Sequence, residues 1–178
     1  MMMCFLLMVL QPFQQVERTI FEVQFIEGRQ ITQAKLALHF LNNEQFSLHL
    51  SKSPAGTLLL YWATPERDVL TFPKQSKSFV GAAGEPFALF ANGPRLTRGE
   101  WLNLLQKGNA KDLGLWEIYK MGEWFSLTDA DRTFRIRWTE TSRIVRPNVH
   151  ERVLQPDPQS LQAAEPLVAL IGFEWTDH

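Results

Sequence analysis

The sequence predicts a mainly β protein of the α+β class: one large curled antiparallel sheet, or incomplete β-barrel, of about ten strands with one covering amphipathic helix. Three observations predict it. Many short segments alternate apolar and polar residues with a period of two, turn residues separate these segments, and one longer segment has helical periodicity. Since neither a strand–helix–strand alternation nor an internal repeat occurs, a single antiparallel sheet with short connections follows.

Length and composition agree with one folded domain. Of the 178 residues, 45% are hydrophobic and 21% are charged, as in ordinary globular proteins. The formal net charge of -1 lacks the cationic surplus that binding to phosphates requires, so we expect no nucleic-acid partner. Thirteen Phe and six Trp against two Tyr indicate an apolar interior or cavity.

Residues 1–13 stand apart from the domain, which we place at 14–178. The run M-M-M-C-F-L-L-M-V-L is apolar, but it is too short to span a bilayer and has no charged residue at its start. We expect a remnant of an export signal or a mis-chosen start, with a packed N-terminal helical turn as the alternative. Cys4 is the only cysteine, and methionines rather than small residues precede it, which argues against a lipid anchor there.

The first half of the domain reads as strands joined by turns rich in Gly, Pro, Asn and Asp. We expect strands at 21–25, 34–40, 46–50 and 57–62, and weaker ones at 69–72 and 78–80. The segment T-L-L-L-Y-W at 57–62 is apolar on both faces, which indicates a strand covered on each side.

A capped helix follows. Thr97 and Glu100 have the spacing of a capping box, and Gly108 can take the positive φ that ends a helix. The apolar face of this helix is Trp101, Leu102, Leu104 and Leu105. A shorter helical piece at 86–92 is expected to form a lid turn.

The second half continues with strands. We expect them at 115–119, 123–127, 133–138 and 142–146, and a long apolar strand at 166–175 closes the chain. The links between the first four of these strands, which include Glu140-Thr141, are plausible hairpin turns.

Alternation along the first four strands gives the predicted concave face more apolar side chains than one helix can bury. These are Phe21, Val23, Phe25, Leu36, Leu38, Phe40, Phe46, Leu48, Leu50, Leu58, Leu60 and Trp62. One interpretation is a cavity for acyl chains, which are recognised through apolar area, with Phe87, Phe90, Trp101 and Leu105 as its lid. The other is a solid core with a loop laid over it.

The order F-S-L-H-L, P-A-G turn, T-L-L-L-Y-W, helix L-T-R-G-E-W-L-N-L-L-Q-K-G and final hairpins resembles the lipoprotein-sorting family of LolA and LolB. The resemblance covers 14–175 and is closer to LolB, the outer-membrane receptor. It implies an incomplete barrel covered by helices, which holds the acyl chains of lipoproteins and hands them to the outer membrane. It also implies a place in the bacterial envelope, in the periplasm or at the inner face of the outer membrane.

Two departures from that family stand out. The turn Pro54-Ala55-Gly56 matches the membrane-facing loop, but Ala55 stands where the family has a bulky apolar residue. The loss of two or three CH₂ groups there removes about 2 kcal/mol of membrane partitioning. The family's lipid-attachment motif is also missing around Cys4.

Catalytic and metal motifs are missing, so we expect no enzyme, no cofactor and no metal. His39 and His49 fall on one outward face of adjacent predicted strands, without an evident third ligand, and we interpret them as solvated surface residues. Asp129 and Asp131 lack the rest of a calcium loop and are typical of a hairpin turn. An enzyme built from distant polar groups would leave no local motif.

Arginines gather in the later strands, with Phe134, Ile136 and Trp138 on the opposite face. We take Arg135, Arg137, Arg143 and Arg146 as one outward face, either solvated or docking a carrier protein or anionic lipid headgroups. This leaves a second functional hypothesis from another class: a non-catalytic structural or protein-interaction β module of the cell envelope with a filled core.

Overall fold

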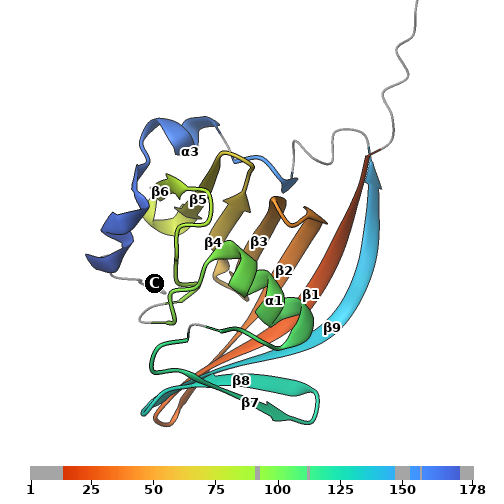
Figure 1. Cartoon of the computed structure of the whole chain (residues 1–178), viewed down its shortest axis with the longest axis vertical. Coiled ribbons are helices and arrows are strands. Elements are labelled where there is room, and N and C mark those ends of the chain that lie inside the picture. The colour runs from red at the N-terminus through yellow and green to blue at the C-terminus, as the bar shows by residue number, and fades with distance from the viewer. Residues whose placement is uncertain (1–13, 91–92, 112, 147–152, 157, 173–178) are drawn as a thin grey trace, which may run out of the picture.

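One continuous curled sheet dominates the molecule, and it does not close into a barrel (Figure 1). The computed structural model describes residues 14–90, 93–111, 113–146, 153–156 and 158–172. Within these residues the sheet has ten strands in the order β10-β6-β5-β4-β3-β2-β1-β9-β8-β7. All neighbours are antiparallel except β10 and β6, which run parallel. The predicted class is therefore confirmed, with a mixed sheet in place of a purely antiparallel one.

The strands are β1 (Gln14–Glu27), β2 (Gln30–Asn42), β3 (Gln45–Lys52), β4 (Gly56–Ala63), β5 (Arg67–Phe72), β6 (Lys77–Ala82), β7 (Glu117–Met121), β8 (Trp124–Thr128), β9 (Arg132–Arg146) and β10 (Glu165–Pro166). The helices are η1 (Pro73–Gln75), α1 (Arg98–Lys107), α3 (Pro158–Gln162) and η2 (Leu167–Gly172), of which η1 and η2 are 3₁₀ helices. The first six strands are joined in sequence by short connections, so they form a meander whose outer edge is β6.

The two strands predicted at 133–138 and 142–146 are a single strand, β9. Glu140 and Thr141, expected to form a turn, pair in register with Ile20 and Thr19 of β1. An extra residue, Thr139, makes a bulge at this point, and its hydroxyl donates a 2.8 Å hydrogen bond to the carbonyl of Ile20. Pairing with the long strand β1 thus keeps Glu140 and Thr141 extended, although their local sequence is typical of a turn.

The closing strand predicted at 166–175 is also wrong. After the two-residue β10, residues Leu167–Gly172 form the 3₁₀ helix η2, and 173–175 lie outside the described residues. Leu167 and Leu170 are three positions apart, so they share one side of a 3₁₀ helix, and both are buried in the main core. An apolar run that is uniform in composition does not distinguish this arrangement from a buried strand.

The capped helix is confirmed in detail. The Thr97 hydroxyl accepts from the Glu100 amide, the Glu100 carboxylate accepts from the Thr97 amide over 2.8 Å, and Gly108 ends α1 at φ +65°. The expected helical piece at 86–92 is not helical in its described part. Phe87 and Leu96 instead form an antiparallel bridge through two 3.0 Å backbone hydrogen bonds, while 91–92 lie outside the described residues.

Apolar side chains are buried on both sides of the sheet. The main core lies on the concave side, between the strands and α1 (Figure 1). A small second cluster forms where Leu154, from the segment after β9, packs against Val16 of β1, with Leu41, Ile144 and Val153 around them. The residues at 1–13, Cys4 among them, lie outside the described part of the chain.

Candidate functional site

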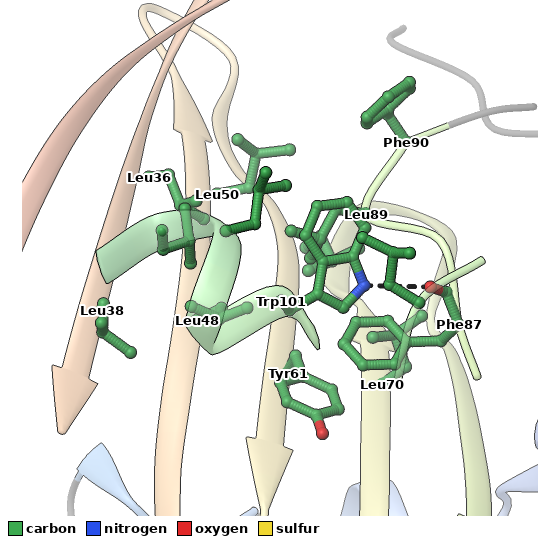
Figure 2. Packing of buried hydrophobic residues seen from close by; sticks show 14 of the residues in the cluster. Leu36, Leu38, Leu48, Leu50, Tyr61, Leu70, Phe87, Leu89, Phe90 and Trp101 are labelled. Atoms are coloured by element: carbon green, nitrogen blue, oxygen red, sulfur yellow. Dashed lines mark hydrogen bonds between the residues drawn. The ribbon is translucent and has the colours of Figure 1, made fainter. Parts of the chain in front are cut away.

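The concave interior is the largest apolar region of the described residues, and three neighbouring strands supply its centre. Seven of the predicted lining residues are buried in the main core: Phe21, Val23, Leu36, Leu38, Phe46, Leu48 and Leu50. Cross-strand pairs such as Leu36 with Leu50 and Leu38 with Leu48 align their side chains beneath α1 (Figure 2). Phe25, Phe40 and Leu58 pack against this core and are partly exposed.

Leu60 and Trp62 do not line the concave side. The pairing of β3 with β4 shifts by one residue between Leu50 and Ser51, so the core-facing set on β4 is Leu59, Tyr61 and Ala63. The sequence analysis placed the other alternating set, which includes Leu60 and Trp62, on the concave side. Because T-L-L-L-Y-W is apolar at every position, alternation does not show which of its residues face the core. The separate expectation that this strand is covered on both sides is confirmed, since Trp62 is also buried.

Sequence reasoning missed a further set of core residues on the later elements. It consists of Leu70, Phe72, Phe79, Leu89, Leu96, Trp116 and Leu127. Part of their signal was present, because Leu70 and Phe72 alternate on β5. Phe134 and Ile136 of β9, which were expected to point inward, also lie in this core. The interior therefore extends across the sheet from β6 to β8.

The four residues predicted as a lid do cover the concave side. The Phe87 ring stacks on that of Tyr61 with centroids 4.2 Å apart, and the Trp101 indole donates a 3.0 Å hydrogen bond to the Phe87 carbonyl (Figure 2). Phe90 lies 4.4 Å from Phe134, measured between ring centroids. Leu105 is buried on the face of α1 that meets the core.

An ion pair between the half-buried Arg98 and the buried Asp68 fastens this cover to the sheet. The Arg98 guanidinium, at the start of α1, lies 3.5 Å from the Asp68 carboxylate of β5 and donates to the Thr64 carbonyl over 2.8 Å. The other Asp68 oxygen accepts from the Gly84 amide over 2.7 Å. Burial raises the pKa of Asp68, while the Gly84 amide, Tyr61 and Arg98 oppose that rise.

The covering segment, by which we mean the described residues 85–90 and 93–107, is bounded by two glycines with positive φ, Gly84 at +86° and Gly108 at +65°. The covering segment keeps the buried members of the main core from solvent, since each of them is at most 8% exposed. An acyl chain can therefore enter only if the covering segment moves away from the sheet.

The turn at Pro54, Ala55 and Gly56 joins β3 to β4 at one end of the meander. Pro54 is exposed, Ala55 is half-buried, and Gly56 takes φ +83°. The methyl group of Ala55 offers this turn little apolar surface, as the sequence indicated.

The arginines that were predicted to share one outward face do not all lie on the same face of the sheet. Arg135 and Arg137 pair with Gln24 and Glu22, but Arg143 pairs with Glu17, on the other face, because of the Thr139 bulge. Arg137 lies over the Trp124 ring and 2.5 Å from the Glu22 carboxylate, so it is already engaged. The side chain of Arg146 lies outside the described ones.

Trp138 was expected to point inward with Phe134 and Ile136. It pairs in register with Phe21 directly before the bulge, yet it is 59% exposed, while Phe134 and Ile136 are buried. The turn prediction at Asp129 is confirmed: its carboxylate accepts from the amides of Asp131 and Arg132 and pairs with the Arg132 guanidinium, which lowers the pKa of Asp129.

The histidines on β2 and β3 are not solvated, which corrects the prediction. His39 is 6% exposed and its ring centroid lies 4.7 Å from that of His49, which is half-buried. Sequence periodicity placed both on the outward face correctly, but it could not show that a distant segment covers them.

No protein-family model and no curated protein matches this chain. Among the described residues, no group of three or more His, Cys, Asp or Glu side chains could hold a metal ion. No helix in that part of the chain is both long and apolar enough to cross a membrane.

Proposed function

We propose that this protein is a carrier or receptor that holds acyl chains of lipids or lipoproteins in its concave interior during outer-membrane lipoprotein localisation. The observation that carries the proposal is an open, curled sheet whose concave side is apolar across its width and is covered by one short helix and a loop. Acyl chains are recognised through apolar area, so such an interior needs no specific polar contacts. The resemblance in segment order to LolA and LolB supports the same proposal.

In this proposal the covering segment is the entrance. Removing the rings of Phe87, Phe90 and Trp101 from the sheet would expose apolar side chains that acyl chains can then contact. Opening exposes apolar area to water, and this free-energy cost is partly offset because the methylenes of a bound acyl chain bury the area that the rings had covered. In this proposal the site binds an acyl chain by its partitioning from water into an apolar interior, and it carries out no catalytic step.

The second hypothesis, a protein-interaction β module with a filled core, keeps one observation in its favour: the interior side chains are packed against one another. Its docking surface needs revision, because the arginines of β9 lie on different faces and Arg137 is paired. Uptake of ligand separates the two hypotheses, since a permanently filled core admits no chain.

The test is native mass spectrometry with palmitate and with a dipalmitoylated cysteine lipopeptide, together with displacement of an environment-sensitive naphthalene dye. Phe40→Gln changes a partly exposed residue that packs on the concave core, and Leu60→Gln changes a half-buried residue of the opposite face. Saturable one-to-one uptake weakened by Phe40→Gln and spared by Leu60→Gln supports the proposal. No uptake by a folded chain, or equal loss in both variants, contradicts it.

A further inference from the structure

The convex side of the sheet carries a buried polar cluster that the proposed function does not use. His39, Ser47 and Trp62 form one row across β2, β3 and β4, since each pairs in register with the next. His49 lies two residues along β3 from Ser47, on the same face. Four neighbouring side chains with polar atoms thus meet on a face that would ordinarily be solvated.

The Ser47 hydroxyl lies at the centre of this cluster. It donates its only hydrogen to the carbonyl of Val153 over 2.5 Å. Its contacts with His39 Nδ1, at 3.4 Å, and His49 Nε2, at 3.3 Å, must therefore be donated by the imidazoles. This fixes the neutral tautomer of each ring and leaves the opposite nitrogen as the one that a proton can occupy.

Val153 begins the C-terminal arm, by which we mean the described residues 153–156 and 158–172. Leu154 is fully buried against Val16, so the arm covers the convex face beside the histidines. Farther along, Glu165 and Pro166 pair with β6, and the arm then reaches the concave core. The arm is therefore attached to both faces of the sheet (Figure 1).

We propose that His39, Ser47 and His49 form a pH-sensitive latch that holds the start of the C-terminal arm on the convex face at neutral pH and releases it in acid. The latch is a regulatory device, and it stands independently of what the concave interior binds. Its basis is geometric: two adjacent imidazoles share one hydroxyl, and that hydroxyl holds the arm through a single carbonyl.

Burial of the rings beside a positive charge explains why acid would open the latch, because a protonated ring regains water when the arm leaves. Of the described residues, Arg18 of β1, which pairs in register with His39, is the charged group that acts on the cluster. β4 adds Leu60 and Trp62, and residues 153–156 add V-L-Q-P, none of which titrates in this range. A proton on either ring would place a second positive charge beside Arg18, without a carboxylate among these neighbours.

The pKa values agree with this reasoning. Burial first, then His49 and Arg18, lower the pKa of His39 to about 3, while burial and Arg18 lower that of His49 to about 4. Release uncovers both rings and so raises both pKa values toward 6.5, and the released form binds protons that the latched form does not. Arg18 stays beside His39 on the sheet, so at pH 5 this favours release by at most about 30-fold for one histidine and about a thousandfold for both.

The experiment measures exposure of the arm through a buried thiol. Leu154→Cys is made in the full chain with Cys4→Ser, and its reaction rate with 4,4′-dithiodipyridine is divided by that of glutathione at each pH. We expect this ratio to rise at least about tenfold between pH 7.5 and pH 5. The same ratio for Leu48→Cys, a fully buried residue of the concave core, should stay low at both values.

The histidine variants decide the cause. His39→Gln with His49→Gln should abolish the rise, leaving the ratio within about threefold across the pH range. If that double variant does not fold, Arg18→Gln serves instead, and it should move the rise to higher pH by removing the opposing charge. A ratio that does not depend on pH, a rise that persists without the histidines, an unmoved midpoint in Arg18→Gln, or an equal rise at Leu48→Cys overturns the latch.

Discussion

The indole of Trp101 donates a 3.0 Å hydrogen bond to the backbone carbonyl of Phe87, which ties helix α1 to the segment that precedes it. Both residues are fully buried. Phe87 in turn stacks on Tyr61 of β4. Through these two contacts Phe87 joins the helix, the loop and the sheet, and the cover of the concave interior depends on them.

Replacement of Trp101 by Phe should keep most of the packing and remove the hydrogen bond. The Phe87 carbonyl would keep the Leu96 amide as its other donor, so loss of the indole hydrogen bond costs about 0.5–1.5 kcal/mol of unfolding free energy, to which the smaller ring adds a loss of packing. Trp138→Phe is the matched control, because Trp138 is 59% exposed and should change stability by less than about 0.5 kcal/mol. Urea denaturation measures both, and equal effects would contradict the role of this contact.

The pair of Arg98 and Asp68 should show strong coupling. Arg98→Met leaves the fully buried Asp68 carboxyl without its cation, so we expect a loss of about 3–5 kcal/mol. Adding Asp68→Asn to that variant should cost less than the two single effects predict together. Thermal or urea unfolding of the four proteins in this cycle gives the coupling energy, and simple additivity would show that the pair does not fasten the cover.

The faces of β4 can be tested with two adjacent leucines. Leu59 lies in the main core and is fully buried, whereas Leu60 is half-buried on the convex side. Leu59→Ala should therefore cost about 2–5 kcal/mol, and Leu60→Ala clearly less. Chemical denaturation separates the two, and a larger loss at Leu60 would restore the face assignment made from the sequence.

Stability should fall in mild acid because of the two histidines. Their pKa values in the folded protein, about 3 for His39 and about 4 for His49, lie below the usual 6.5, so the unfolded chain binds more protons in between. The stabilisation is complete above pH 6.5 and is lost as the pH falls, at up to about 1.4 kcal/mol per pH unit for each histidine.

Urea denaturation at pH 7.5, 6 and 5 measures this loss. The variant with His39→Gln and His49→Gln should have a flatter stability profile than the natural chain over the same range. Identical slopes in the two proteins would show that other groups take up the protons.

The fold could be predicted where local chemistry decides structure. The capping box of Thr97 and Glu100, with Gly108 at the end, specified α1 almost to the residue. Alternation located most strands, because one buried face imposes a period of two. The bulge at Thr139 and the one-residue shift on β4 could not be predicted, since both depend on the pairing partner.

The candidate site was predicted in part for the same reason. The alternating residues of β1 to β3 identified the concave face. The sequence of β4 is apolar at nearly every position, so it does not show which residues face the core. Ser47, which contacts both His39 and His49, donates to the carbonyl of Val153, and no local pattern reveals a contact between residues that lie 106 positions apart. The 3₁₀ helix η2 was missed because residues 167–171, L-V-A-L-I, contain neither a turn residue nor a polar break.

The most direct test of the proposed function is photo-crosslinking with a palmitate analogue that carries a diazirine midway along its acyl chain, followed by mapping of the modified residues. The account predicts saturable crosslinks, competed by palmitate, at concave residues such as Leu48, Tyr61 and Trp101. Absence of saturable crosslinks, or crosslinks confined to convex residues such as Leu60, would show that the interior does not hold acyl chains.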